Sequence, residues 1–159
     1  MSNLPQRTAL VLLPGEARRI GSVDGPEVLE YATSELTDGT LTLIATGGTE
    51  VGSGPPMHIH HRNNEAFFVL AGSYRMHVAG DEYQCPAGSF IYLPPGTVHG
   101  FYALEPGTRK LNIYAPSSHE GFFEDLDAIM ADGADEGRID DLFRRHDTEI
   151  VGPIPPMYR

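Results

Sequence analysis

The stretch PPMHIHHRNNEAFFVLAG, residues 55–72, places three histidines within four positions and a glutamate shortly after them. Side chains alternate between the two faces of a β-strand, so His58 and His60 share one face if residues 56–61 form a strand. His61 then points to the opposite face together with Ile59. We therefore favour a surface or supporting role for His61 over direct ligation.

The residues after the histidine pair are typical of a short turn and a returning strand. Residues 62–64, Arg-Asn-Asn, form a polar turn, and an antiparallel return places Glu65 beside the two histidines. Two imidazoles and a carboxylate on one face of a hairpin suit a divalent metal ion. The strongest candidate for a fourth ligand is His99, which follows the turn PPGTV and opens another predicted strand. The other lone histidines, His77, His119 and His146, are expected to be structural or exposed.

Short runs of Val, Ile, Leu, Thr, Tyr and Phe are separated by glycines and prolines through most of the chain. Many short strands with turn residues every eight to twelve positions indicate an all-β sandwich or barrel. The predicted strands are 8–13, 27–33, 39–46, 56–61, 65–72, 73–80, 81–85, 89–94, 98–104 and 109–115.

The pattern changes after residue 116. Apolar residues then recur at helical spacing, with Ser117 or Ser118 as the N-cap and Gly133 as the stop, and these apolar residues are Phe122, Leu126, Ile129 and Met130. A second short helix is predicted over 138–147. The segment 151–159 is too rich in proline for regular structure, and we expect it to lie over the barrel or a partner subunit.

Length and composition limit the number of domains, the kinds of partner and the cellular location. The chain has 159 residues and a net charge of −11, which indicates one domain and argues against binding nucleic acid or an anionic membrane. No segment approaches the ~20 apolar residues of a membrane span, and the run ALVLL at 9–13 is too short for a signal-peptide core. The single cysteine, Cys85, excludes an intrachain disulfide and favours the cytoplasm. We expect it to be a small buried side chain rather than a reactive thiol.

Two segments of the chain resemble the two motifs of the cupin superfamily. The first motif is matched completely by Gly52, SGPPM, His58-Ile59-His60, HRNN, Glu65, AFFVLA and Gly72. The second is matched by Gly88, SFIYL, Pro94-Pro95-Gly96, TV, His99 and GFY, but Ala103 stands where the family pattern has asparagine. That asparagine is not a metal ligand, so the departure affects only a polar role at this position.

The resemblance implies a jelly-roll barrel, also called a double-stranded β-helix, with a short C-terminal helical extension. We expect one cupin domain over 1–159, with the barrel core at about 38–115 and the helices and tail at 117–159. The family's metal ligands carry over to His58, His60, Glu65 and His99. Such a set holds one divalent transition metal ion, which is Fe, Mn, Ni, Co, Cu or Zn, and leaves one or two coordination positions open.

Aromatic and apolar residues near the motifs predict the wall of a substrate pocket. The residues assigned to it are Met57, Phe67, Ile91, Leu93, Phe101 and Ala103. No lysine or arginine is expected inside the barrel, although Arg62 and Arg75 stay open as candidates. This composition favours a flat, largely apolar small molecule with an enol, phenol or diketone oxygen.

In detail the sequence is similar to small quercetin 2,3-dioxygenase-like cupins. This resemblance implies metal-dependent oxygenation of an aromatic or enolic small molecule, with O2 as co-substrate and Glu65 as both ligand and catalytic base. Two alternatives remain open: a non-oxidative metal-dependent cyclase or isomerase of a polyketide-like substrate, and a non-enzymatic small-molecule-binding module. The family also implies a homodimer in which the N-terminal strands or the tail cross over.

Overall fold

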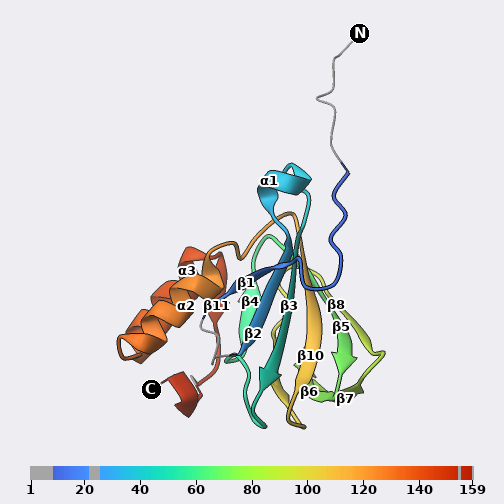
Figure 1. Cartoon of the computed structure of the whole chain (residues 1–159). Coiled ribbons are helices and arrows are strands. Elements are labelled where there is room, and N and C mark those ends of the chain that lie inside the picture. Colours follow the sequence, from blue (N-terminus) through green and yellow to red (C-terminus); the bar gives the residue numbers. More distant parts are fainter. Residues whose placement is uncertain (1–8, 22–25, 154, 159) are drawn as a thin grey trace.

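Two antiparallel β-sheets face each other in the computed structural model, which describes residues 9–21, 26–153 and 155–158 (Figure 1). The first sheet has the strand order β1 (Arg18–Ile20), β2 (Glu27–Ala32), β3 (Thr42–Thr49), β10 (Thr108–Ala115), β5 (Asn64–Ala71) and β8 (Phe90–Leu93). The second has the order β11 (Thr148–Ile150), β4 (His58–His60), β9 (His99–Ala103), β6 (Ser73–Val78) and β7 (Asp81–Pro86). The predicted all-β jelly-roll fold is confirmed.

Helical segments are few and lie mainly near the C-terminus. They are α1 (Ser34–Thr37), α2 (Phe122–Ala131), α3 (Glu136–Arg145) and a 3-10 turn, η1 (Pro156–Tyr158). Both predicted C-terminal helices are present, but α2 begins later than expected, with Gly121 at the N-cap instead of a serine. No helix in the described ranges combines the length and apolar character needed to cross a bilayer.

Strand β10 lies in the middle of the first sheet and sets which side chains enter the barrel. Its buried residues alternate with less buried ones, so Lys110, Asn112 and Tyr114 share the inward face. The register pairs Tyr114 of β10 with Glu65 of β5. In the second sheet, the register pairs His58 of β4 with His99 of β9. The two motif segments thus meet inside the same barrel.

The apolar core fills the space between the sheets on one side of these residues. It consists of Phe67, Val69, Tyr74, Met76, Cys85, Leu93 and Ala103. Cys85 is buried, as predicted, and burial raises the pKa of its thiol, which disfavours the reactive thiolate. Gly72, between β5 and β6, has a φ of +68°, and a Cβ there would lie 2.9 Å from the Cα of Thr108. Only glycine meets both conditions without strain.

The strand predicted at 8–13 is wrong for the residues that the structure describes. Residues 9–13 form no strand, and Leu10, Val11 and Leu13 are exposed. Residue 8 lies outside the described part. An apolar run without a neighbouring strand has no partner for its backbone groups, so β-propensity alone does not make it a strand.

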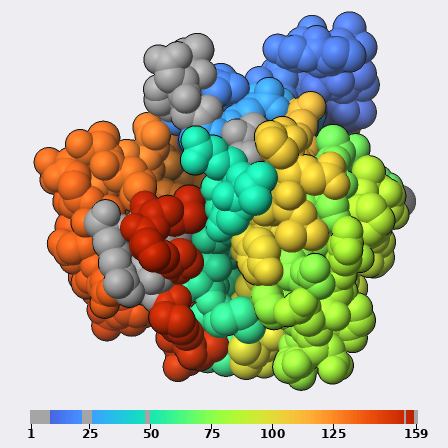
Figure 2. Space-filling view, turned by 90° about the horizontal axis from the view of Figure 1, so that it is seen from below, coloured from blue at the N-terminus to red at the C-terminus, as the bar shows by residue number. Residues whose placement is uncertain are grey.

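The C-terminal region is part of the second sheet, which the sequence did not indicate. Strand β11 pairs with β4, with Thr148 opposite His60. The backbone N–H of Val151 then donates to the carbonyl of Met57 at 2.8 Å. Figure 2 shows the red C-terminal segment against the teal residues that precede β4, with the orange helices beside it. The described part of the tail therefore lies over the barrel. This was one of the two predicted alternatives, the other being a partner subunit.

Candidate metal centre

Four side chains from three strands converge inside the barrel: His58, His60, Glu65 and His99. One ligand atom of each lies within 4.8 Å of those of the others. All four residues are between 1% and 4% exposed. Alternation on β4 turns His58 and His60 to the same side, and the β4–β9 register places His99 opposite His58. The structure thus brings together all four predicted ligands.

Backbone carbonyls fix the orientation of two imidazoles. Nδ1 of His58 lies 2.7 Å from the carbonyl oxygen of Pro56, and Nδ1 of His99 lies 2.9 Å from that of Thr97. A carbonyl oxygen can only accept, so Nδ1 carries the proton in both rings. The lone pair of each neutral ring is therefore on Nε2, the atom that faces the cluster.

His60 is oriented by a residue from the C-terminal region. The hydroxyl of Thr148 lies 3.1 Å from Nδ1 of His60 and donates to the carbonyl of His146, also at 3.1 Å. Since the hydroxyl proton is used by His146, the oxygen accepts the Nδ1 proton of His60. Nε2 of His60 is then free to bind a cation, like those of the other two histidines.

Glu65 is held by a buried tyrosine as well as by the histidines. Burial and the neighbouring Glu65 raise the pKa of Tyr114 well above its ordinary value, so its hydroxyl keeps its proton and hydrogen-bonds the carboxylate. Burial alone would raise the pKa of Glu65, but the adjacent imidazoles of His60 and His99 hold the pKa of its carboxyl well below the usual range. The carboxylate is therefore ionised at neutral pH.

The arrangement of acceptor atoms fits a metal ion. Nε2 of His60 and Nε2 of His99 each lie 2.9 Å from the same oxygen, Oε2 of Glu65. Nε2 of His60 is buried and has no hydrogen-bond partner among the described residues. Burial and the nearby His99 also lower the pKa of His58 to about 3, so its ring is neutral at pH 7. Converging lone pairs repel each other unless a cation lies between them, and imidazole with carboxylate is a donor set for transition metals.

The neighbouring histidine and arginines lie outside this centre. His61 is on the surface and pairs with Glu149 at 3.0 Å, so its predicted orientation away from the site is confirmed. Arg62 is exposed and pairs with Asp147, and Arg75 pairs with Glu82 on the surface. Neither arginine is available to a ligand inside the barrel.

Five of the six residues predicted for the pocket wall face the barrel interior. Phe67, Leu93 and Ala103 belong to the buried core, and Ile91 and Phe101 pack against it. Met57 is the exception, and its assignment to the interior was wrong. It lies against the positions of Gly100 and Gly152, on the outer side of the second sheet and under the C-terminal tail. Because His58 points inward, strand alternation turns Met57 outward.

Four buried residues at or beyond the centre were not predicted: Lys110, Tyr114, His119 and Thr148. The expectation of no lysine inside the barrel is wrong, because Lys110 is 3% exposed on the inward face of β10. Alternation along β10 could have identified Lys110 and Tyr114, because residues 110, 112 and 114 are two positions apart and share one face of the strand. The ring of His119 stacks on Tyr114 with centroids 4.2 Å apart and lies 4.8 Å from the ring of His60. No local pattern marks His119 or Thr148, since only the path of the C-terminal region brings them here.

The C-terminal helices cover the histidine side of the centre. Phe143 of α3 places its ring 5.8 Å from that of His58, and it packs edge-on against Phe122 of α2. His119 contacts both His60 and Phe122. These rings shield the centre from water on this side.

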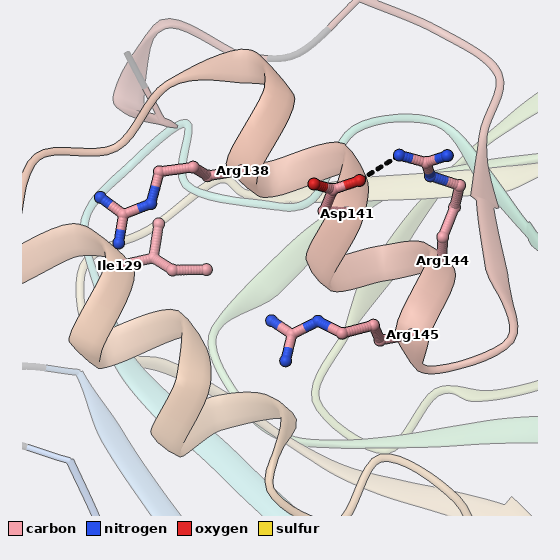
Figure 3. Close-up of a pocket in the computed structure, with 5 residues that line it drawn as sticks. All are labelled: Ile129, Arg138, Asp141, Arg144 and Arg145. Atoms are coloured by element: carbon pink, nitrogen blue, oxygen red, sulfur yellow. Dashed lines mark hydrogen bonds and ion pairs between the residues drawn. The ribbon is translucent and has the colours of Figure 1, made fainter.

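A separate groove of about 630 Å³ lies between α2 and α3, far from any of these ligands in sequence (Figure 3). It is lined by Ile129, Arg138, Asp141, Arg144 and Arg145. Each arginine is paired with a carboxylate: Arg138 with Asp132 at 3.1 Å, Arg144 with Asp140 at 3.1 Å, and Arg145 with Asp125 at 3.0 Å. Its positive charges are therefore already neutralised, and the groove is not an obvious anion site.

Comparison with known proteins agrees with this geometry. A cupin domain model matches residues 37–111. Quercetin 2,3-dioxygenase from Bacillus subtilis is 29% identical over 116 residues, which is 73% of this chain but only 34% of that protein. The chain therefore spans about a third of the length of this relative.

Solved structures show the same architecture at low sequence identity. KdgF from Halomonas sp. superposes with a TM-score of 0.60 at 20% identity, covering 69% of this chain and 94% of that one. A predicted oxalate decarboxylase from Thermotoga maritima gives a TM-score of 0.58 at 18% identity, covering 67% and 99%. The matching model, the barrel and the converged histidines and glutamate together identify residues 37–111 as a cupin domain.

Proposed function

We propose that this protein is a metal-dependent dioxygenase acting on an aromatic or enolic small molecule. The observation that carries the proposal is the buried cluster of three imidazoles and one carboxylate next to an aromatic wall. The similarity to a bacterial quercetin 2,3-dioxygenase supports the reaction class. Because cupins host many reactions, the substrate has to be argued from the site itself.

The metal would be held by Nε2 of His58, His60 and His99 and by the carboxylate of Glu65. When bound, a redox-active divalent ion supplies a Lewis acid for an enol or phenol oxygen and an electron path to O2. Three neutral imidazoles and one carboxylate leave a divalent ion with a net charge near +1. That charge attracts an anionic or polarisable substrate oxygen to the centre.

Glu65 is the residue best placed to move a proton. Its carboxylate is ionised at neutral pH, because His60 and His99 hold its pKa well below the usual range. An ionised carboxylate beside the bound substrate can accept the proton of an enol or phenol hydroxyl. Tyr114 keeps the carboxylate oriented by its hydrogen bond, so the proton is accepted in a fixed geometry.

The aromatic wall suits a flat substrate. Phe67 and Phe101 meet edge to face with ring centroids 5.3 Å apart, and Phe67 lies 6.4 Å from the ring of His99. Tyr74 meets Phe101 in the same manner at 5.5 Å. Such rings bind planar molecules by dispersion and exclude water from the reacting oxygen.

Metal analysis of the natively purified protein, combined with an O2-uptake screen, tests the proposal. The screen uses flavonols, β-diketones and catechols, with the wild type and the His99→Ala and His61→Ala variants. We expect O2 uptake with at least one class in the wild type and His61→Ala, and none in His99→Ala. Turnover without O2 in a zinc-loaded protein would replace this proposal with the non-oxidative alternative. Tight binding without any turnover would favour a binding module.

We also propose that the chain forms a homodimer. The outer face of β5 and β8 exposes four large apolar residues on adjacent strands, Phe68, Leu70, Phe90 and Tyr92. Exposed apolar patches of this kind commonly mark protein interfaces. Light scattering should give twice the chain mass for the wild type and the chain mass for Phe90→Glu; a monomeric wild type would refute the dimer.

The cytoplasmic location stays a prediction.

A further inference from the structure

Lys110 is the only lysine of the chain, and its side chain lies inside the barrel. The residue is 3% exposed. It shares the inward face of β10 with Asn112 and Tyr114, and the register places it opposite Val69 of the neighbouring strand β5. The other residues with a permanently cationic side chain are arginines. A buried lysine is uncommon, because its ammonium loses its hydration.

The surroundings of the Lys110 amine are mostly aromatic. Nζ lies 4.3 Å from the ring centroids of both Phe67 and Phe101, and 5.9 Å from that of Tyr74. It also hydrogen-bonds the amide oxygen of Asn112, and the hydroxyl of Thr46 is 3.4 Å away. Aromatic faces and neutral oxygens stabilise an ammonium, but they do not neutralise it.

No carboxylate forms an ion pair with Lys110 in the part of the chain that the structure describes. Burial lowers the pKa of the amine to about 7, although the charge of Glu65 acts in the opposite direction. Among the described residues, the acidic group that acts on the amine is Glu65, and that carboxylate belongs to the candidate metal centre. When it is protonated, Lys110 is therefore a cation inside the barrel without an ion-pair partner among the described residues.

With a metal ion bound, the barrel interior would carry more positive than negative charge. A divalent ion held by Glu65 and three neutral imidazoles leaves about one positive charge, and a protonated Lys110 adds a second. A buried charge without a partner is destabilising, and an apolar side chain of similar size would pack at least as well. The interior therefore lacks negative charge, which a bound organic anion would supply.

We propose that Lys110 determines substrate class: its ammonium binds the carboxylate of an aromatic or enolic acid, whose ring or enol plane packs against Phe67 and Phe101. This rests on the proposed function only in assigning the substrate's hydroxyl oxygen to the metal centre. The expected substrate is then an acid with a second oxygen on the far side of its planar part. Within the classes of the O2-uptake screen, members that carry a carboxylate are therefore expected to bind more tightly than neutral ones.

The test uses 3-hydroxybenzoate and its neutral isostere 3-hydroxybenzamide as probes, with zinc-loaded protein in which no O2 chemistry occurs. Protein grown on lysine labelled with ¹³C at Cε gives one lysine signal, because Lys110 is the only lysine. We expect 3-hydroxybenzoate to shift this signal and to raise the pKa read from it, whereas the benzamide leaves the pKa unchanged. Calorimetry should show the acid binding roughly tenfold or more tighter than the amide, as charge-assisted hydrogen bonds do.

Two variants distinguish a specific contact with Lys110 from a general effect of positive charge on acid binding. Lys110→Met should abolish the preference for the acid and change the affinity for the amide by less than about threefold. Arg109→Met removes one positive charge from the adjacent residue, whose guanidinium pairs with Glu27 at 2.7 Å, and should keep the preference.

Equal affinity of wild-type protein for acid and amide would overturn the proposal. So would acid binding that leaves the Lys110 signal in place, a Lys110→Met variant that keeps the preference, or no acid binding up to its solubility limit. None of these readouts requires turnover. A failed O2-uptake screen with an intact acid preference would therefore refute the dioxygenase proposal alone.

Discussion

Compared with the four ligands of the candidate metal centre, Lys110 lies in a different part of the same barrel. The ligand layer comprises His58, His60, Glu65 and His99. Its lone pairs converge, and each imidazole has its second nitrogen held by Pro56, Thr148 or Thr97. The lysine layer comprises Lys110 with Phe67, Tyr74 and Phe101, and it surrounds a positive charge with aromatic faces.

The two layers are incomplete in opposite senses. The ligand layer gathers acceptors without a cation, and the lysine layer holds a cation without an anion. Both arrangements are unfavourable for a protein that only has to fold, because buried polar groups are normally satisfied within the structure. Each layer is therefore better explained by what it binds, a metal ion in one case and an organic anion in the other.

Removing a metal ligand is the largest expected change, and it affects the ligand layer alone. His58→Ala or His99→Ala should reduce bound metal to background, because each leaves three ligands and an unfilled space. The matched control is His61→Ala, which removes a surface imidazole paired with Glu149 and should keep full metal content. Metal per chain is measured by mass spectrometry of the purified variants. Equal losses in all three variants would contradict the assignment of faces on β4.

Replacing Lys110 by methionine should stabilise the protein, by about 1–4 kcal/mol at pH 7. The pKa of Lys110 is about 7 in the folded protein and 10.5 ordinarily, so the unfolded chain binds more protons between these values. Wild-type stability therefore rises with pH across this window, and the advantage of Lys110→Met should shrink from pH 7 to pH 10. Urea unfolding at several pH values measures this. A destabilised variant at pH 7 would show that the amine is a structural group.

Thr148→Val tests the contribution of the C-terminal region to the ligand layer. The substitution keeps the shape of the side chain but removes the oxygen that accepts from Nδ1 of His60. Metal affinity should fall by about 10–100-fold, as for other residues that orient metal-binding imidazoles. Competition with a chelator measures the affinity. Thr97→Val is a suitable control, since His99 hydrogen-bonds the backbone carbonyl of Thr97, while the hydroxyl of Thr97 donates to the carbonyl of Pro94. An equal loss in both variants would argue against a role for the Thr148 hydroxyl.

Acidification should weaken the metal-free protein through the ligand layer. Burial and the adjacent His99 lower the pKa of His58 from 6.5 to about 3, so the unfolded chain binds more protons between these values. Stability from this group is complete above pH 6.5 and is lost as pH falls toward 3. Between pH 7 and pH 5 the loss should be about 1–2 kcal/mol. Urea unfolding of His58→Gln should show a smaller dependence over this range, and an unchanged dependence would mean that another group is responsible.

The two layers also differ in how far the sequence could predict them. The ligand layer depends partly on local spacing, since His58 and His60 are two residues apart on β4. The hairpin predicted from this stretch is wrong, because β4 and β5 lie in different sheets and Glu65 meets the two histidines across the barrel. His99 could be predicted because the turn before it marks the start of a strand. The turns and strands predicted an all-β sandwich or barrel, and the resemblance to the cupin motifs implied its jelly-roll form.

Residues that reach the site through long-range packing could not be predicted in this way. Thr148 belongs to β11, whose pairing with β4 depends on the path of two helices, and nothing local marks it. Lys110 shares an inward face with Tyr114, but lysine is so rarely buried that composition argued against it. Met57 was assigned to the pocket wall as an apolar residue near the first motif, although alternation turns it outward.

X-ray absorption of the natively purified protein is the most direct test of the central claim, that His58, His60, Glu65 and His99 bind a metal ion. If this claim holds, each chain binds one ion with nitrogen and oxygen neighbours at about 2.0–2.2 Å. The spectrum should show scattering from three imidazoles in the wild type, and His99→Ala should show no metal above background. A sulfur neighbour, fewer than three imidazoles in the wild type, or protein that binds no transition metal would contradict it.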